Sequence, residues 1–287
     1  MARWRAHADS AAAESPFDAM AARALPSWLA LPLWLHDAWA PAASGPRALH
    51  HILWGQYALF TFIRLQDDLL DAHFHDLRIQ FIADAFLADS LESFQALPLP
   101  AAFWDGYQQA LRDTADAILE VRDIESVPGA FTAALLPLHA RVGAIFRVGS
   151  AAVCHLLDRG DALSWVAGLQ ASLAVFGQVC DDLEDVADDL EQQRYTFCGN
   201  ILIAAGRDDI AAAADTTARL GAGMLDASRA VPLIAALRDA AAAAAAAVPD
   251  AAPQRIRTYT AALRQRADDV DRALHESRVR HVFGPLP

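Results

Sequence analysis

The sequence predicts an all-α protein, and three features of its composition support this. Hydrophobic residues make up 55% of the 287 positions, enough to bury a large core. Alanine dominates this fraction, and alanine is the best helix former. Alternating runs of β-branched residues bounded by turn residues, the pattern of strands, are nearly absent. We therefore expect a single-domain helical bundle over residues 25–287, preceded by a lead-in of residues 1–24.

Helical periodicity, interrupted by clusters of proline and glycine, predicts the individual elements. A break at Pro41–Pro46 precedes a long helical pattern from Arg47 to about Leu87, and further breaks lie at residues 97–101 and 127–129. No long linker separates the segments, which indicates one domain. The remaining helical patterns cover residues 130–158, 162–192, 200–220, 228–248 and 253–277.

Charge and cysteine content limit the partners and the compartment. The formal net charge of −13 argues against nucleic acid, because a phosphate backbone requires a basic surface. The three cysteines are too few and too scattered for a disulfide framework, and the N-terminus lacks the apolar core of a signal peptide. We expect a cytoplasmic protein. The apolar stretch Leu25–Leu35, broken by two prolines, allows peripheral membrane contact at most.

Two acidic clusters follow apolar helical runs. The first contains Asp67, Asp68 and Asp71, of which the outer two lie one helical turn apart on the same face. The second runs from Asp181 to Glu191, where seven of eleven residues are acidic. Like charges one turn apart oppose helix formation by roughly 0.2–0.5 kcal/mol per pair. Such an accumulation predicts a bound cation that offsets the repulsion; a solvated acidic face is the alternative.

Carboxylate ligands without cysteine or paired histidine favour a hard cation, Mg²⁺ or Mn²⁺. Mg²⁺ usually keeps several waters and binds one or two carboxylates together with substrate phosphate oxygens. The two acidic clusters therefore predict a site for Mg²⁺ or Mn²⁺.

The motifs Asp67-Asp68-x-x-Asp71 and Gln178-x-x-Asp181-Asp182-x-x-Asp185 together resemble those of the class I isoprenoid synthases. This superfamily includes trans-prenyltransferases, squalene and phytoene synthases and class I terpene synthases. The resemblance covers about residues 47–200 and implies a helical bundle with a central active-site cavity. It implies that the first motif binds two of three Mg²⁺ ions and that Asp181 and Asp185 hold the third. The second motif can also be aligned so that Asp182, Asp188 or Asp189 completes this site.

The resemblance implies further residues that bind the substrate. Arg141 takes the place of a lysine that touches the allylic diphosphate in chain-elongating prenyltransferases, and Arg147 is a second candidate. Arg194 and Tyr195 follow the second motif, similar to a Gly-Arg segment of squalene and phytoene synthases, although Gln193 replaces the glycine. Three more residues are expected to line the pocket or to limit the substrate to C10–C20: Gln178, Phe62 and Ile63.

The chemistry of this superfamily accounts for such residues. Departure of diphosphate leaves an allylic carbocation, so cations must stabilise the leaving anion and an apolar pocket must exclude water. Chain-elongating relatives bind a second diphosphate with lysine and paired arginines, but all 23 basic residues here are arginine and only Arg78 closely follows the first motif. We therefore expect a noncanonical, Mg²⁺-dependent terpene synthase that cyclises or rearranges one prenyl diphosphate. The oligomeric state stays open between a monomer and a homodimer, the form that relatives often take.

Three alternatives stay open. A prenyltransferase would couple two prenyl diphosphates, by chain elongation or by head-to-head condensation. A metal-dependent phosphohydrolase with a helical His-Asp site would use His50, His51, His73, His75 and Asp76, but it leaves the second acidic cluster unexplained. A non-catalytic helical scaffold would release no diphosphate from any prenyl substrate.

Overall fold

The structure is a computed structural model that describes residues 26–40, 46–70, 78–204 and 227–283. Within these ranges the chain forms ten α-helices and three short 3-10 helices, and it contains no strand. The predicted all-α class is confirmed. The expected lead-in of residues 1–24 lies outside the described residues.

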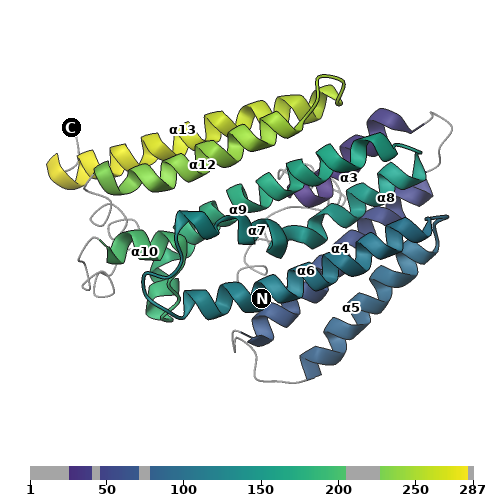
Figure 1. Ribbon diagram of the computed structural model, residues 1–287, viewed down its shortest axis with the longest axis horizontal. Helices are drawn as coiled ribbons and strands as arrows, with labels where there is room; N and C mark the ends of the chain where they lie inside the picture. Colours follow the sequence, from purple (N-terminus) through teal and green to yellow (C-terminus); the bar gives the residue numbers. More distant parts are fainter. Residues whose placement is uncertain (1–25, 41–45, 71–77, 205–226, 284–287) are drawn as a thin grey trace, which may run out of the picture.

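The helices are arranged as two outer pairs with a central group between them (Figure 1). Helices α12 and α13 form one outer pair, α4 and α5 form the other, and α6, α7, α8 and α9 lie between them. The long helices are α4 (Pro46–Leu70), α5 (Arg78–Gln95), α6 (Ala101–Glu125), α9 (Leu163–Glu191), α12 (Ala227–Ala247) and α13 (Gln254–Phe283). The shorter helices are α3 (Ser27–Trp39), η1 (Ala133–Leu135), α7 (Pro137–Val142), η2 (Gly143–Arg147), α8 (Val148–Leu156), η3 (Gly160–Ala162) and α10 (Phe197–Ile203).

Helix α9 is the central helix of the fold. It packs against α7, η2, α10 and α12, and its first five turns supply buried residues such as Leu169 and Phe176 to the core. The segment Gly160–Val186 is long and apolar enough to cross a membrane by length and composition, with a mean hydropathy of 1.4. One third of this apolar window is buried inside the bundle, and the acidic cluster begins before the segment ends.

Two buried polar side chains fix the segment between α6 and α9. Gln56 of α4 donates from Nε2 to the carbonyl of Ile145 at 3.2 Å and accepts from the backbone N–H of Gly149 at 2.6 Å. Thr114 of α6 donates to the carbonyl of Val142 at 3.1 Å. Buried backbone groups that lack a helical partner are satisfied in this way, which holds α7, η2 and α8 in place.

The predicted single helix from Arg47 to Leu87 is wrong. Helix α4 ends at Leu70, α5 begins at Arg78, and the two helices pack side by side, which one straight helix cannot do (Figure 1). The local sequence contains no proline or glycine that would signal a break there. Helix α6, between two correctly predicted breaks, was not predicted.

The predicted helix over residues 130–158 is also wrong, because the structure divides this segment into η1, α7, η2 and α8. Gly143 lies against α9 so closely that an added Cβ would stand 2.5 Å from the Cβ of Ala174. This close approach coincides with the change from α-helix to 3-10 helix. The apolar stretch at the N-terminal end becomes α3, which continues through Pro32 and buries Leu29, Leu31 and Leu35 inside the protein.

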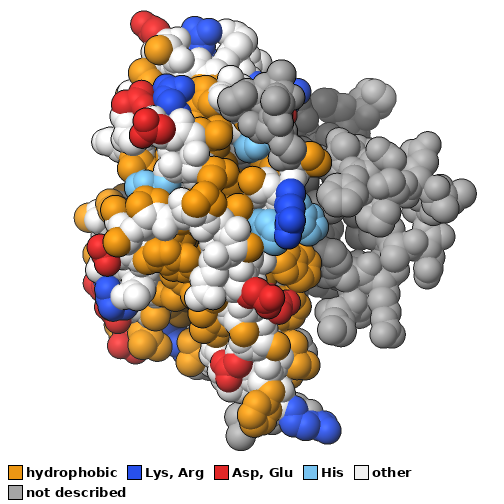
Figure 2. All heavy atoms as spheres, turned by 90° about the vertical axis from the view of Figure 1, so that its right-hand side faces the viewer, with side chains coloured by type: hydrophobic (Ala, Val, Ile, Leu, Met, Phe, Trp, Pro, Cys, Tyr) orange, Lys and Arg blue, Asp and Glu red, His pale blue; other side chains and the backbone are white. Residues whose placement is uncertain are grey.

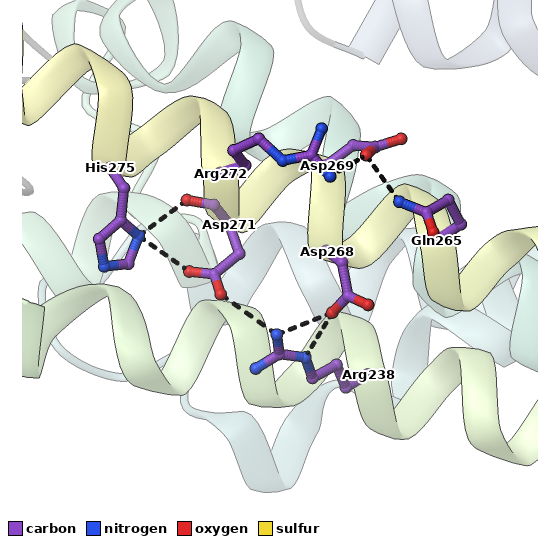
Figure 3. A network of polar contacts seen from close by, with 7 residues as sticks. All are labelled: Arg238, Gln265, Asp268, Asp269, Asp271, Arg272 and His275. Atoms are coloured by element: carbon purple, nitrogen blue, oxygen red, sulfur yellow. Dashed lines mark hydrogen bonds and ion pairs between the residues drawn. The ribbon is translucent and has the colours of Figure 1, made fainter.

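Helices α12 and α13 are joined on their exposed side by charged residues (Figure 3). Arg238 of α12 contacts Asp268 at 2.7 Å and Asp271 at 3.1 Å on α13, and His275 lies 3.2 Å from Asp271. Exposed ion pairs of this kind contribute at most about 1 kcal/mol. The buried alanine and leucine side chains of α12, such as Leu237 and Ala241, therefore hold this pair to the bundle.

Candidate functional site

The two acidic clusters meet at one open cleft of about 290 Å³ between α4, α6, α7 and α9. Seven carboxylates and three guanidinium groups line it, which gives a formal balance of −4. The end of the molecule drawn in Figure 2 differs, because hydrophobic side chains cover much of it. The lining residues are Arg64, Asp67, Ile118, Val121, Arg122, Glu125, His139, Val142, Gln178, Asp181, Asp182, Asp185, Asp188, Asp189, Gln192 and Arg194.

The second cluster forms one wall of the cleft because α9 continues unbroken through Glu191. Asp181 and Asp185 lie one turn apart and are exposed to the open side. Asp182 and Asp189 are buried, with 2% and 8% of their surface exposed. The acidic cluster is therefore only partly a solvated face, and two of its carboxylates are held inside the protein.

Burial and mutual repulsion perturb these carboxylates. Burial raises the pKa of Asp182 to about 7, although a hydrogen bond from Gln178 Nε2 to Oδ1 at 2.8 Å opposes the rise. Burial also raises the pKa of Asp189 to about 6, against the attraction of Arg194. Partial removal from water and repulsion by Asp185 raise the pKa of Asp181. A wall with several raised carboxylate pKa values is one that a cation would stabilise.

The first cluster faces the cleft through Asp67 of α4. Arg64, one turn earlier, lies 3.5 Å from Asp67 Oδ2 and 3.2 Å from Asp68 Oδ1. Asp68 is half-buried beside the cleft rather than in its lining, and Asp71 lies outside the described residues. Arg64 was not predicted as a site residue, although its spacing of three and four residues from two aspartates was visible in the sequence.

The wall opposite α4 contains residues that the sequence did not indicate. Glu125, at the end of α6, is 4% exposed and lies 3.4 Å from Arg194, which also stands 3.6 Å from Asp189. Tyr195 donates its backbone N–H to the carbonyl of Glu125 at 2.8 Å, and its side chain is not part of the lining. Arg194 therefore reaches the cleft as predicted from the resemblance, while Tyr195 supports it through the backbone.

His139 of α7 is a further residue of the cleft, and it is 3% exposed. Its ring stacks on Phe131 at 5.1 Å between centroids, and burial lowers its pKa to about 4, so the imidazole is neutral at pH 7. Among the described residues, the only buried side-chain polar atoms without a hydrogen-bond partner are His139 Nε2 and Asp182 Oδ2. Both belong to residues that line this cleft.

Besides Tyr195, four predicted substrate residues are not in the lining of the cleft. Arg141 pairs with Glu120 at 2.6 Å and Arg147 pairs with Asp113 at 3.1 Å, and all four of these residues lie outside the lining. Phe62 and Ile63 are half-buried and pack against the core. Helical geometry explains why Arg141 is outside the lining. His139 and Val142 lie three residues apart on α7 and both line the cleft, so they share one face of this helix. Arg141 lies about 100° around the helix from Val142 and therefore points away from that face.

Aromatic side chains gather two turns before Asp67 along α4. Phe60 stacks on Trp28 of α3 at 4.4 Å, and Phe146 of η2 lies 5.8 Å from Trp28 and 6.1 Å from Phe60. All three rings are half-buried. The three rings pack against one another where α3, α4 and η2 meet, and none of them belongs to the lining of the cleft.

The carboxylates fit Mg²⁺ held jointly with a phosphate ligand rather than a closed protein cage. No group of three or more His, Cys, Asp or Glu in the described ranges stands close enough together to hold a metal alone. Mg²⁺ usually requires only one or two carboxylates when water and phosphate oxygens complete its shell. Asp181 and Asp185 provide such a pair, and the repulsion that raises the pKa of Asp181 is what a cation would relieve.

No protein-family model, curated protein or solved structure matches the chain. The function of the chain is therefore inferred from the residues of the cleft.

Proposed function

We propose that the chain is a Mg²⁺-dependent class I terpene synthase with a bundle of the isoprenoid synthase type. It ionises an allylic prenyl diphosphate of C10–C20 and cyclises or rearranges the resulting carbocation. One observation carries the proposal: Asp67 on α4 and Asp181 on α9, 114 positions apart in the sequence, line the same cleft. The spacing and the residue types match the two motifs, and the cleft gives them a common place to act.

The charge of the cleft supports a requirement for divalent cations. With a formal balance of −4, the lining repels a diphosphate unless cations bind with it. Asp67, Asp181 and Asp185 would hold these cations, which supply neutralisation of the charge on the departing diphosphate. Arg194, steadied by Glu125 and Asp189, is placed to orient the same group. A guanidinium suits phosphate oxygens because it can donate two parallel hydrogen bonds.

The apolar side chains of the cleft support the second step of the proposed reaction, the cyclisation or rearrangement of the carbocation. Ile118, Val121 and Val142 contribute apolar surface to the lining of the cleft. Phe60, which packs with Trp28 of α3 and Phe146 of η2, lies two turns before Asp67 on α4. An allylic carbocation requires such surroundings because water would quench it to an alcohol.

The competing functions have less support. A purely solvated acidic face would not bury Asp182 and Asp189. For a His-Asp phosphohydrolase, the two described histidines, His50 and His51, lie on α4 outside the lining of the cleft. The other three candidate residues for that site, 73, 75 and 76, lie outside the described residues.

The test is incubation of the protein and Mg²⁺ with geranyl, farnesyl or geranylgeranyl diphosphate, each with and without isopentenyl diphosphate. We expect diphosphate release and a cyclic or rearranged product, identified by gas chromatography, from one allylic substrate alone. Product that forms only with isopentenyl diphosphate would instead identify a prenyltransferase. Absence of diphosphate release with every substrate would show that the proposal is wrong and leave the scaffold alternative.

A variant pair ties the activity to the cleft. Asp181→Ala should lower diphosphate release by at least about 100-fold, because it removes a metal ligand, with far-UV circular dichroism unchanged. Asp269→Ala on α13 is the matched control, since this residue is exposed and far from the cleft lining. Wild-type turnover in the Asp181→Ala variant would contradict the assignment of the metal ligands.

A further inference from the structure

Arg64 is a cation built into the cleft next to the first acidic cluster. Its guanidinium contacts both Asp67, at 3.5 Å, and Asp68, at 3.2 Å, and its side chain is 57% exposed. It also lies near enough to α9 for its charge to favour the ionised form of Asp181 on the opposite wall. Arg64 therefore stands between the two sets of carboxylates that the proposed function assigns to metal ions.

The partners of Arg64 set it apart from Arg194 in the same cleft. Arg194 is held by Glu125 and Asp189, and Glu125 is not a proposed metal ligand. Arg64, by contrast, contacts two carboxylates of the first motif itself. A divalent cation that binds Asp67 and Asp68 must therefore displace this guanidinium or share the carboxylates with it.

The displacement is feasible because exposed ion pairs are weak. An exposed pair three or four residues apart on a helix stabilises its two charges only slightly, so a divalent cation can compete with it. The displaced guanidinium would keep its charge and its five N–H donors within the cleft. A diphosphate bound to the same metal ions presents oxygens to which a guanidinium donates stronger, charge-assisted hydrogen bonds.

We infer that Arg64 is a tethered cation that neutralises Asp67 and Asp68 while the cleft holds no diphosphate, and that it binds the diphosphate once metal ions take these two carboxylates. The inference rests on the proposed function and adds a binding order to it. Metal alone must compete with Arg64, whereas metal and diphosphate together give Arg64 a new partner. The two ligands then bind with positive coupling, and each raises the affinity for the other by the same factor.

The experiment measures binding rather than turnover. Mn²⁺ binding is followed by the loss of the free-ion EPR signal, first without and then with inorganic pyrophosphate, and pyrophosphate binding is followed by calorimetry in excess Mn²⁺. In the Arg64→Gln variant we expect the affinity for Mn²⁺ alone to rise about three- to fivefold, because its competitor is gone. The affinity for pyrophosphate in the presence of Mn²⁺ should fall about tenfold.

Two further variants separate charge from geometry and from general effects. Arg64→Lys keeps the competing charge but loses the planar fork, so its affinity for Mn²⁺ alone should stay at the wild-type value while its affinity for pyrophosphate falls. Arg272→Gln on α13 is the matched control, because Arg272 pairs with Asp269 three residues earlier at 2.9 Å and is similarly exposed. This control should bind both ligands as the wild type does.

Opposite changes in Mn²⁺ and pyrophosphate affinity in Arg64→Gln, absent from Arg272→Gln, would support the inference. Equal affinities in Arg64→Gln and the wild type, or a parallel loss of both ligands, would overturn it while Mn²⁺-dependent pyrophosphate binding by the wild type still supported the proposed function. A wild-type protein that binds no pyrophosphate at any Mn²⁺ concentration would overturn both. Melting temperatures of all variants verify that the fold is retained.

Discussion

Replacement of Asp182 by asparagine tests whether the ionised, buried carboxylate of Asp182 lowers the stability of the fold. Asp182 is 2% exposed, and only Oδ1 has a partner, the side chain of Gln178 at 2.8 Å. Burial is the main cause that raises its pKa from 3.8 to about 7. Because the folded-state pKa lies above the unfolded value, this group stabilises the fold fully below about pH 4. That contribution is lost as the pH rises through about 7.

The magnitude follows from the two pKa values. In the unfolded chain the carboxyl ionises near pH 4, whereas in the folded protein it resists ionisation until about pH 7. Linkage between these values makes the wild-type protein lose about 2–3 kcal/mol of unfolding free energy between pH 5 and pH 8 through this group alone. Asparagine cannot ionise, so Asp182→Asn should gain about this much relative to the wild type over the same interval. Any fixed cost of the amide cancels in that difference.

The assay is urea unfolding followed by far-UV circular dichroism, with EDTA present, at pH 5 and pH 8. Asp105→Asn, at an exposed position of α6 outside the cleft lining, controls for the loss of one carboxyl group. A difference in unfolding free energy between Asp182→Asn and the wild type that is the same at both pH values would refute the reasoning. A difference that decreases from pH 5 to pH 8 would refute it as well.

Three further substitutions test local packing and hydrogen bonding in the fold. Gly143→Ala should lower the free energy of unfolding by about 1–3 kcal/mol, because its Cβ would stand 2.5 Å from Ala174. Gly106→Ala on α6, where an added Cβ meets no atom within 4 Å, should raise it by about 0.5–1 kcal/mol. Asn200→Ala should lower the free energy of unfolding by about 2–4 kcal/mol, since the buried side-chain amide forms hydrogen bonds with three backbone groups of two loops. Urea denaturation measures the stability of all three variants. An unchanged midpoint for Gly143→Ala or for Asn200→Ala would contradict the corresponding prediction.

Helix boundaries were predictable where the sequence marks them and not elsewhere. Helix α9 was predicted at 162–192 and found at Leu163–Glu191, because a glycine and polar residues precede it and its apolar face repeats regularly. The separation of α4 from α5 could not be predicted, since no proline or glycine lies between Leu70 and Arg78. The packing of one helix against the other, a tertiary effect, decides this boundary.

Some residues of the cleft could be predicted from local sequence patterns, whereas others are brought there only by tertiary packing. The acidic positions came from local spacing, and the structure brings Asp67, Asp181, Asp182, Asp185 and Asp189 to one cleft. Glu125 and His139 could not be predicted, because only the packing of α6 and α7 against α9 brings them there. Arg141 was chosen by resemblance of its segment, and the rotation of α7 directs it to Glu120 instead. Local patterns thus identify residue types, whereas helix rotation decides which of them share a surface.

The distribution of unsatisfied groups argues that the cleft is a functional site rather than a by-product of acidic composition. A helix selected only for solubility would direct its carboxylates to water and bury its apolar side. Helix α9 instead buries Asp182 and Asp189, and the two buried polar atoms without partners in the described ranges, His139 Nε2 and Asp182 Oδ2, belong to this cleft. Each such atom costs about 1–3 kcal/mol. Proteins retain such costs where a ligand or a reaction uses the atom, so Asp182→Asn should gain stability relative to the wild type as the pH rises from 5 to 8 and should also lower diphosphate release.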